Sequence, residues 1–384
     1  MIRTESARGR VALMVAHCAG MVDLVALPVW VGTLISRYGL DPQRTGLLAT
    51  LFLVGAVLAS VVLAPLFHRL RGRWVATLGF GLSGVGFWAL STTQDFATLA
   101  VLHGLCGMAA GAALSVTHGT IARSVNPHRL FAIVGIALGV FGVAFMAATP
   151  QLVAKLGGPT LFMVFATVMA VATLVSLLAF PAPDAAPTGA ARRGGAIPAA
   201  VWFGIVGIAC MGLVQSMTFS FLERVGSDRG FGLQAVTAVL VAGGIVNLFP
   251  AGLAAVLEKR WAARTVMLAG PLLQALLVAT IMNAQTYVPY AVAASLFVSV
   301  MIFTHTFAFG LLARLDSSGR AMAATPATVM IGAAIGPILG GTLVKVFGYG
   351  SLGAAALVIA AVAVFCFSRI PSHTAAMARQ ESLA

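Results

Sequence analysis

The sequence predicts an all-α membrane protein whose twelve transmembrane helices form two parallel six-helix halves. The first observation is composition: of 384 residues, 60% are hydrophobic and only 9% are charged, whereas a soluble chain of this length carries about 25% charged residues. The second is spacing, because the apolar residues gather into twelve runs of about 20 residues, enough to cross ~30 Å of hydrocarbon. The third is that short segments recur half a chain length apart.

The twelve runs follow one another along the whole chain. The first is too long for the apolar core of a signal peptide and has no small-residue cleavage site after it, so we expect it to be retained as a helix. In order, the expected spans are 11–35, 43–66, 74–92, 97–121, 130–153, 159–180, 199–222, 233–256, 264–283, 287–312, 321–345 and 350–368.

The basic residues alternate in number between successive connecting segments. If the N-terminus is cytoplasmic, the cytoplasmic segments hold 17 of the 23 Lys and Arg residues and the outer loops hold 6. This bias is the positive-inside rule of membrane proteins, so the net charge of +13 requires no nucleic-acid partner. We therefore expect a multi-pass protein of the cell inner membrane with both termini in the cytoplasm.

Two short segments of the first half recur in the second. "LRGRW" (70–74) is echoed by "LEKRW" (257–261), and "ARSVNPHRLFA" (122–132) by "ARLDSSGRAMA" (313–323), at offsets of 187 and 191 residues. Even numbers of spans separate the copies, so the two halves have the same orientation. Such parallel halves, with a substrate site at their interface, are typical of one large class of transporters.

The stretch "PAPDAAPTGAARRGGAIP" (181–198) is the only long polar segment, and its composition predicts a cytoplasmic linker. The predicted organisation is a six-helix bundle over 1–180, the linker over 181–198, and a second bundle with a short cytoplasmic tail over 199–384.

The segment "GLDPQRTGLLATLFLVGAVLASVVLAPLFHRLRGRW" (39–74) resembles the second span and the following signature loop of the major facilitator superfamily. In that family an acid stands at the position of His68, and the Gly-Arg pair is displaced here by one residue, to Gly72 and Arg73. Arg69 and Arg73 match the basic members of the loop, so the resemblance implies a gating role for them.

A second motif of the family, Gly-x-x-x-Gly-Pro-x-x-Gly-Gly, is intact in the eleventh span as "GAAIGPILGG" (332–341). The family's antiporters carry it in the fifth span instead. Gly332, Gly336 and Gly340 share one helix face, which allows a neighbouring backbone to approach closely, and Pro337 frees a carbonyl and weakens the helix. Static packing and a bending joint both remain open as readings of this motif.

One acid stands alone at the centre of an apolar run. Asp23 lies near the bilayer midplane of the first span, where a carboxylate costs at least ~2.5 kcal/mol. An acid that exchanges its proton at this depth is what a proton carrier requires, so we predict a coupling or substrate-binding role. The alternative is a permanently protonated Asp that is hydrogen-bonded to a neighbouring helix. Pro28 could kink the helix beside it.

The resemblance implies that spans one, four, seven and ten line a central cavity, and their deep polar or aromatic residues are then candidate substrate ligands. Trp30 shares the helical face of Asp23, and Gln215 lies near the half-chain repeat of Asp23, 192 residues later. The candidates are Trp30, His103, Gln215, Ser216, Thr304 and His305. A packed, hydrogen-bonded ring is the alternative reading for each histidine.

No ATP-binding loop occurs, so we expect no enzyme activity and a secondary transporter without a cofactor. No metal-ligand spacing is present, and the four cysteines lie inside predicted spans as packing residues. No span has a deep Lys or Arg, which favours a cationic or neutral organic substrate. The expected partners are this small molecule, protons and the lipid bilayer, for a monomeric protein. Proton-coupled export is preferred; proton-coupled nutrient uptake, or a sensor or scaffold that has lost transport, is the alternative.

Overall fold

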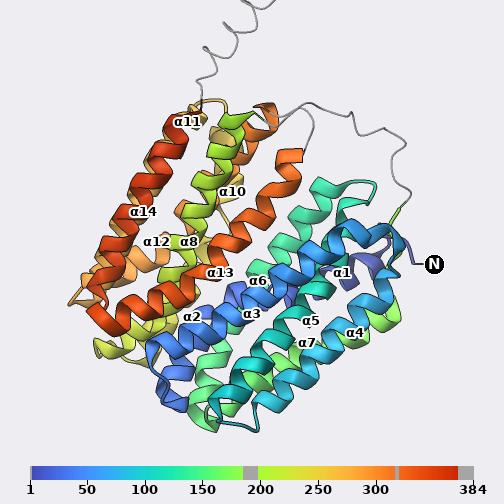
Figure 1. Ribbon diagram of the computed structural model, residues 1–384, viewed down its shortest axis with the longest axis horizontal. Coiled ribbons are helices and arrows are strands. Elements are labelled where there is room, and N and C mark those ends of the chain that lie inside the picture. The colour runs from blue at the N-terminus through green and yellow to red at the C-terminus, as the bar shows by residue number, and fades with distance from the viewer. Residues whose placement is uncertain (1, 185–197, 316–319, 371–384) are drawn as a thin grey trace, which may run out of the picture.

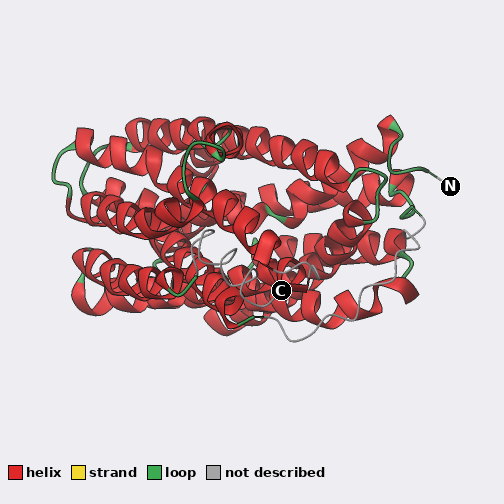
Figure 2. Ribbon diagram, turned by 90° about the horizontal axis from the view of Figure 1, so that it is seen from above, coloured by secondary structure: helices red, strands yellow, loops and turns green. Residues whose placement is uncertain are grey.

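A computed structural model describes residues 2–184, 198–315 and 320–370; the side chains of 64, 65, 68, 313, 314 and 320–328 are outside this description. The described part is built from helices and contains no strand (Figure 2). Most of the predicted linker and the predicted C-terminal tail lie outside the described residues.

The first half contains seven α-helices and one 3-10 helix (Figure 1). Its first predicted span is divided into two helices, and its second ends in the 3-10 helix. The elements are α1 (Ala7–Gly20), α2 (Val22–Tyr38), α3 (Pro42–Leu63), η1 (Ala64–Arg69), α4 (Gly72–Leu90), α5 (Phe96–Ala122), α6 (Pro127–Leu156) and α7 (Pro159–Ala179).

The second half repeats this order, again with one span divided. Pro250 has no N–H to donate to the preceding turn, so the eighth span is interrupted at residues 247–249. The elements are α8 (Ala199–Asp228), α9 (Leu233–Val246), α10 (Pro250–Leu257), α11 (Ala263–Asn283), α12 (Tyr287–Leu315), α13 (Arg320–Phe347) and α14 (Gly350–Ser368).

The predicted all-α membrane fold is confirmed. Within the described residues, eleven spans are long and apolar enough to cross a membrane, with α1–α2 and α9–α10 each counted as one. The helix at the remaining predicted position is α4, which falls short by composition because it is rich in glycine and contains Arg73 in its first turn.

The bundle has two ends that are easily told apart. The N-terminus, Pro181 and Ser368 lie at one end of the bundle, named here the linker end (Figure 1). The opposite end, named here the distal end, carries the short connections that follow α2, α4, α6, α8, α11 and α13.

The two halves touch mainly through three helix pairs: α2 with α8, α3 with α13, and α6 with α9. Among the described side chains, every hydrogen bond between the halves joins α3, or Asp41 just before it, to α13 near the distal end. Lys345 donates to Asp41 at 3.3 Å and to Gln43 at 3.1 Å. The structure is therefore closed between the halves at its distal end.

Candidate transport site

The first span breaks beside its acid. Helix α1 ends at Gly20, Met21 takes φ −108° and ψ 18°, and α2 begins at Val22. Asp23 is thus the second residue of a helix that starts inside the membrane span, and its side chain is 8% exposed. The sequence predicted a continuous helix with a kink at Pro28; Pro28 is inside α2, and the interruption lies seven residues earlier.

The position of Asp23 suits the start of a helix. The first amides of a helix have no carbonyl partner within the helix, and a negative group near them is favoured by the helix dipole. Met21 gives α2 no side-chain cap, and Asp23 is the acid in the first turn of this helix.

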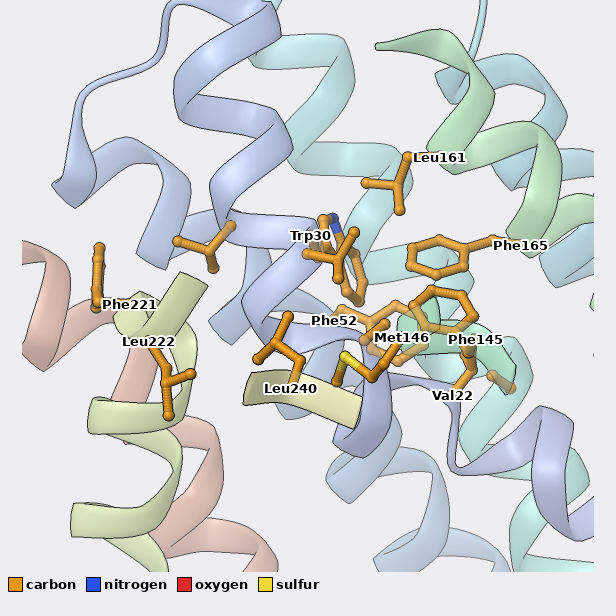
Figure 3. Packing of buried hydrophobic residues seen from close by; sticks show 14 of the residues in the cluster. Val22, Trp30, Phe52, Phe145, Met146, Leu161, Phe165, Phe221, Leu222 and Leu240 are labelled. Atoms are coloured by element: carbon orange, nitrogen blue, oxygen red, sulfur yellow. The ribbon is translucent and has the colours of Figure 1, made fainter. Parts of the chain in front are cut away.

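Trp30 and His103 lie together in the interior of the first half. Their rings stack with centroids 5.4 Å apart, and Trp30 also meets the edges of Phe52 and Phe165 at 5.3 and 5.0 Å (Figure 3). Trp30 is 1% exposed and His103 is fully buried. The Trp30 ring is therefore part of this aromatic core. Its predicted role as a substrate ligand stays a prediction.

The histidine in this core has one satisfied and one unsatisfied nitrogen. Nδ1 of His103 is 2.6 Å from the Leu99 carbonyl, which can only accept, so Nδ1 donates. Nε2 of His103 and Nε1 of Trp30 are buried and have no hydrogen-bond partner. Each stacked ring therefore has one unpaired nitrogen, an acceptor on His103 and a donor on Trp30.

The four candidates of the second half all contact neighbours within that half. Oε1 of Gln215 accepts from Nε2 of Gln274 on α11 at 3.3 Å, a residue that sequence reasoning did not select. Thr304 packs directly on Gly270 of α11, and the ring of His305 lies 3.9 Å from that of Phe309. Their contact with a substrate likewise stays a prediction.

Ser216 has a specific partner in the Gly-Pro motif. Pro337 has no N–H, which leaves the Ala333 carbonyl one turn earlier without its helical donor. The Ser216 hydroxyl donates to that carbonyl at 2.6 Å. One residue further along α13, Thr50 of α3 donates to the Ala334 carbonyl at 2.8 Å and accepts from the Ile338 amide at 3.2 Å. The weakened segment of α13 is therefore held from both halves.

The glycines of the motif allow close helix packing, as their spacing predicted. A β-carbon on Gly332 would overlap the Ala209 carbonyl of α8, and one on Gly336 would be 2.6 Å from the Met217 amide. Gly340 packs on the same residue, Met217. The following glycine, Gly341, instead meets the Pro42 carbonyl of the other half. A bending role for Gly332, Gly336, Pro337 and Gly340 stays a prediction.

The two arginines of the signature loop lie at the linker end. Arg69 is the last residue of η1 and Arg73 the second residue of α4, and both side chains are exposed. Arg73 lies 5.9 Å from the Trp74 ring, and neither arginine belongs to an ion pair among the described residues. Their gating role stays a prediction.

Two further sets of polar side chains lie outside the candidate ligands named above. His17 and His118 lie with Nδ1 and Nε2 3.0 Å apart, joining α1 to α5. Glu223, one residue beyond the predicted span 199–222, lies within α8, which continues to Asp228. Oε2 of Glu223 is buried without a hydrogen-bond partner. The apolar run counted for this span ended at residue 222, one position too early to reveal it.

Residues 12–317 match the family model described as Major Facilitator Superfamily. Among solved structures, a mutant of the nucleoside transporter NupG is similar at a TM-score of 0.76, with 13% identity over 94% of this chain and 99% of its own. A bacterial homologue of the human lysosomal transporter Spinster, inward-facing and unoccupied, gives 0.68, with 15% identity over 95% of both chains. Its occupied inward-facing structure gives 0.70, with 14% identity over 94% of this chain and 93% of its own.

No curated protein sequence matches the chain. At 13% to 15% identity, the likeness to solved structures shows the fold and carries no substrate. The family match extends over most of the chain and agrees with the helical architecture described above. The chain belongs to the major facilitator superfamily, and its fold is that of a secondary transporter.

Proposed function

We propose that this protein is a proton-coupled exporter of a small cationic or neutral organic compound, working by alternating access between its two halves. The observation that carries the proposal is the placement of Asp23 at a helix start within the first span. The Asp23 carboxyl is nearly buried and belongs to a helix that contacts the other half through α8.

The charge of the substrate follows from what the spans lack. A permanent anion inside the membrane needs a counter-charge, because an unpaired ion there is costly. The described Lys and Arg residues stand at or near the ends of the membrane helices, as Arg37, Arg123, Arg224 and Lys345 illustrate. Since Asp23 is the one acid near the middle of a span, it supports a cationic or neutral substrate.

Asp23→Asn tests the coupling step. The variant keeps the size of the side chain and one carbonyl acceptor but removes the exchangeable proton. In proteoliposomes with a pH-sensitive dye inside, substrate addition should move protons with the wild type and leave the dye unchanged with the variant. Asp95→Asn is the matched control, because Asp95 caps α5 at the surface and Asn serves equally well as a helix cap.

Counterflow with compounds sorted by charge identifies the substrate class. It also distinguishes the proposed exporter from an uptake symporter and from a sensor or scaffold. Exchange of cationic or neutral compounds supports the proposal, whereas selective exchange of organic anions contradicts it. Substrate and protons moving in the same direction would establish an uptake symporter instead. Absence of exchange for every class, in a folded protein, would favour a sensor or scaffold.

The orientation is tested separately. The bias of basic residues supports a cytoplasmic linker end. A reporter that matures only in the cytoplasm should give signal when fused after Ala384 and none when inserted at Gln94 in the distal loop before α5. The opposite pattern would reverse the proposed topology and, with it, the proposed direction of export.

A further inference from the structure

A second acid lies between the two halves, away from Asp23. Glu223 is five residues before the end of α8, and its carboxylate rests on the backbone of Gly32 in α2, where a β-carbon would overlap Oε2. Gly32 is nine residues after Asp23, which places it about 13 Å nearer the distal end at 1.5 Å per residue. The contact thus belongs to the closed distal interface.

The two carboxylate oxygens of Glu223 differ in their hydrogen bonding. Oε1 accepts a hydrogen bond from the Ser227 hydroxyl at 2.8 Å. Oε2, the oxygen against Gly32, is buried and has no partner. The carbonyl of Gly32 already accepts from the Ser36 hydroxyl at 2.7 Å. The interface therefore packs closely against Glu223 but supplies neither a positive charge nor a hydrogen-bond donor to Oε2.

The charged and hydroxyl side chains on the helices around Glu223 are bonded to other groups. Arg224 pairs with Asp228 at 2.5 Å, and the Tyr349 hydroxyl donates to the same Asp228 at 2.6 Å. On α12, the Tyr290 hydroxyl donates to the Leu222 carbonyl at 2.8 Å. On α13, Lys345 is held by Asp41 and Gln43. Among the described residues none of these groups neutralises Glu223.

The other neighbouring helices add no charge at this level. Helix α2 has ionisable side chains only at its two ends, Asp23 and Arg37, besides the Tyr38 hydroxyl. Helix α9 has none, and the ionisable groups of α11 and α14, Arg264 and Cys366, lie toward the linker end. An ionised Glu223 would thus be a half-buried charge with one buried oxygen that no group satisfies while the distal end is closed.

We propose that Glu223 binds a proton when the distal end closes and releases it when that end opens, which makes it a second proton site besides Asp23. A carboxylate with one buried and unsatisfied oxygen is costlier than a neutral carboxyl in the same place, and separating α2 from α8 would return Oε2 of Glu223 to water. The closed state therefore holds one more proton. In the proposed topology, this proton comes from the outer side of the membrane.

The sign and size of the effect follow from linkage. If closing takes up one proton, lowering the pH favours the closed state, and the ratio of closed to open molecules rises by up to about tenfold per pH unit. Asp41 does not produce this response. Partial burial acts in the opposite direction, but hydrogen bonds from the Arg44 amide and Lys345 hold the pKa of Asp41 below its usual value, so it stays ionised above about pH 5.

The experiment measures the distance between the halves at the distal end as the pH changes. Spin labels are attached at Gln94→Cys and Gln285→Cys, two exposed positions in distal loops of different halves, after the four native cysteines have been replaced. Electron resonance distances are recorded in nanodiscs from about pH 5 to about pH 8, where buried carboxyls titrate. The readout requires no substrate and no transport.

The wild type should shift toward the short distance as the pH falls. Glu223→Gln, a neutral side chain of the same size, should stay at the short distance throughout. Asp23→Asn should keep the wild-type response, so failure of the proposed coupling at Asp23 would leave this test intact. A wild type that does not respond to pH, or a Glu223→Gln variant that responds like it, would overturn the proposal.

A second variant protects the test against misfolding of the first. Gly32→Ala places a methyl group where Oε2 lies and displaces the end of a flexible side chain without changing any charge. It should weaken the pH response, because the carboxylate no longer fits the closed interface. Gly135→Ala, at an exposed glycine of α6 whose surroundings are open, is the matched control and should respond like the wild type. An unaltered response in Gly32→Ala would contradict the proposed contact.

Discussion

Gly46→Ala should open the distal end, because the two halves touch there at a point with no room for a methyl group. A β-carbon on Gly46 would lie 2.7 Å from the carbonyl carbon of Pro337 and overlap its oxygen, whereas ordinary contacts begin at 3.4 Å. These are backbone atoms of α13, so the clash cannot be relieved by turning a side chain. The helices would have to separate by about 1 Å in an interior that is packed without spare volume.

The steric cost of Gly46→Ala applies only to the closed conformation. Overpacking a tightly packed interior typically costs about 1–3 kcal/mol, and here it is absent once α3 and α13 have separated. A bias of that size changes the ratio of the closed to the open form by about 5- to 150-fold. We therefore expect Gly46→Ala to convert a mainly closed population into a mixture or into a mainly open one.

The spin labels at positions 94 and 285 report the outcome directly. Gly46→Ala should lengthen their distance at constant pH, and Gly135→Ala should leave it unchanged. A thermal melt in detergent confirms that both variants are folded. A folded Gly46→Ala protein with the distance distribution of the control would show that the Gly46–Pro337 contact does not hold the distal end closed.

Three related variants separate the groups around this contact. Thr50→Val removes the hydroxyl that bonds to Ala334 and Ile338 across the halves. A hydrogen bond contributes about 0.5–1.5 kcal/mol. The variant should therefore shift the closed-to-open ratio by about 2- to 12-fold in the same distance assay. Ser216→Ala leaves the Ala333 carbonyl unpaired within one half, so it should lower the thermal stability, by about 1–3 kcal/mol, and leave the distance unchanged; a changed distance would contradict the assignment. Asp41→Asn removes the ion pair with Lys345. Because the pKa of Asp41 is depressed, the stabilisation from this pair is present at neutral pH and lost only as the pH falls through that low pKa, so the variant should reduce closure equally at about pH 5 and pH 8.

Helix positions were predictable because apolar length is a global constraint. The run 264–283 corresponds to α11 (Ala263–Asn283), and 350–368 to α14 (Gly350–Ser368). The interruptions at Met21 and at residues 247–249 were not predicted as breaks. Each depends on a local competition for backbone hydrogen bonds, and the hydrophobicity of the run is the same whether or not the helix continues through it.

The candidate ligands were harder to place than the helices. A helical wheel separates one face from another, but it does not say which face meets the other half and which meets the core of its own bundle. Trp30 and His103 share a stacked pair inside the first half, and Ser216 bonds to the carbonyl that Pro337 leaves free. Those choices are made by shape complementarity between distant segments, which single-residue chemistry does not encode.

The two deep acids show how far chemistry alone can lead and where geometry is needed. Both are carboxyls in apolar helices, and a sequence reading treats them by depth alone. Asp23 stands in the first turn of a helix that starts inside the first span. Glu223 stands near a helix end, against a glycine of the other half, with an oxygen that no group satisfies. The first acid lies at the positive end of a helix dipole, whereas the surroundings of the second favour a neutral acid only while the halves touch. Coupling at one acid and conformational control at the other are therefore separable functions, and Asp23→Asn and Glu223→Gln should affect different measurements.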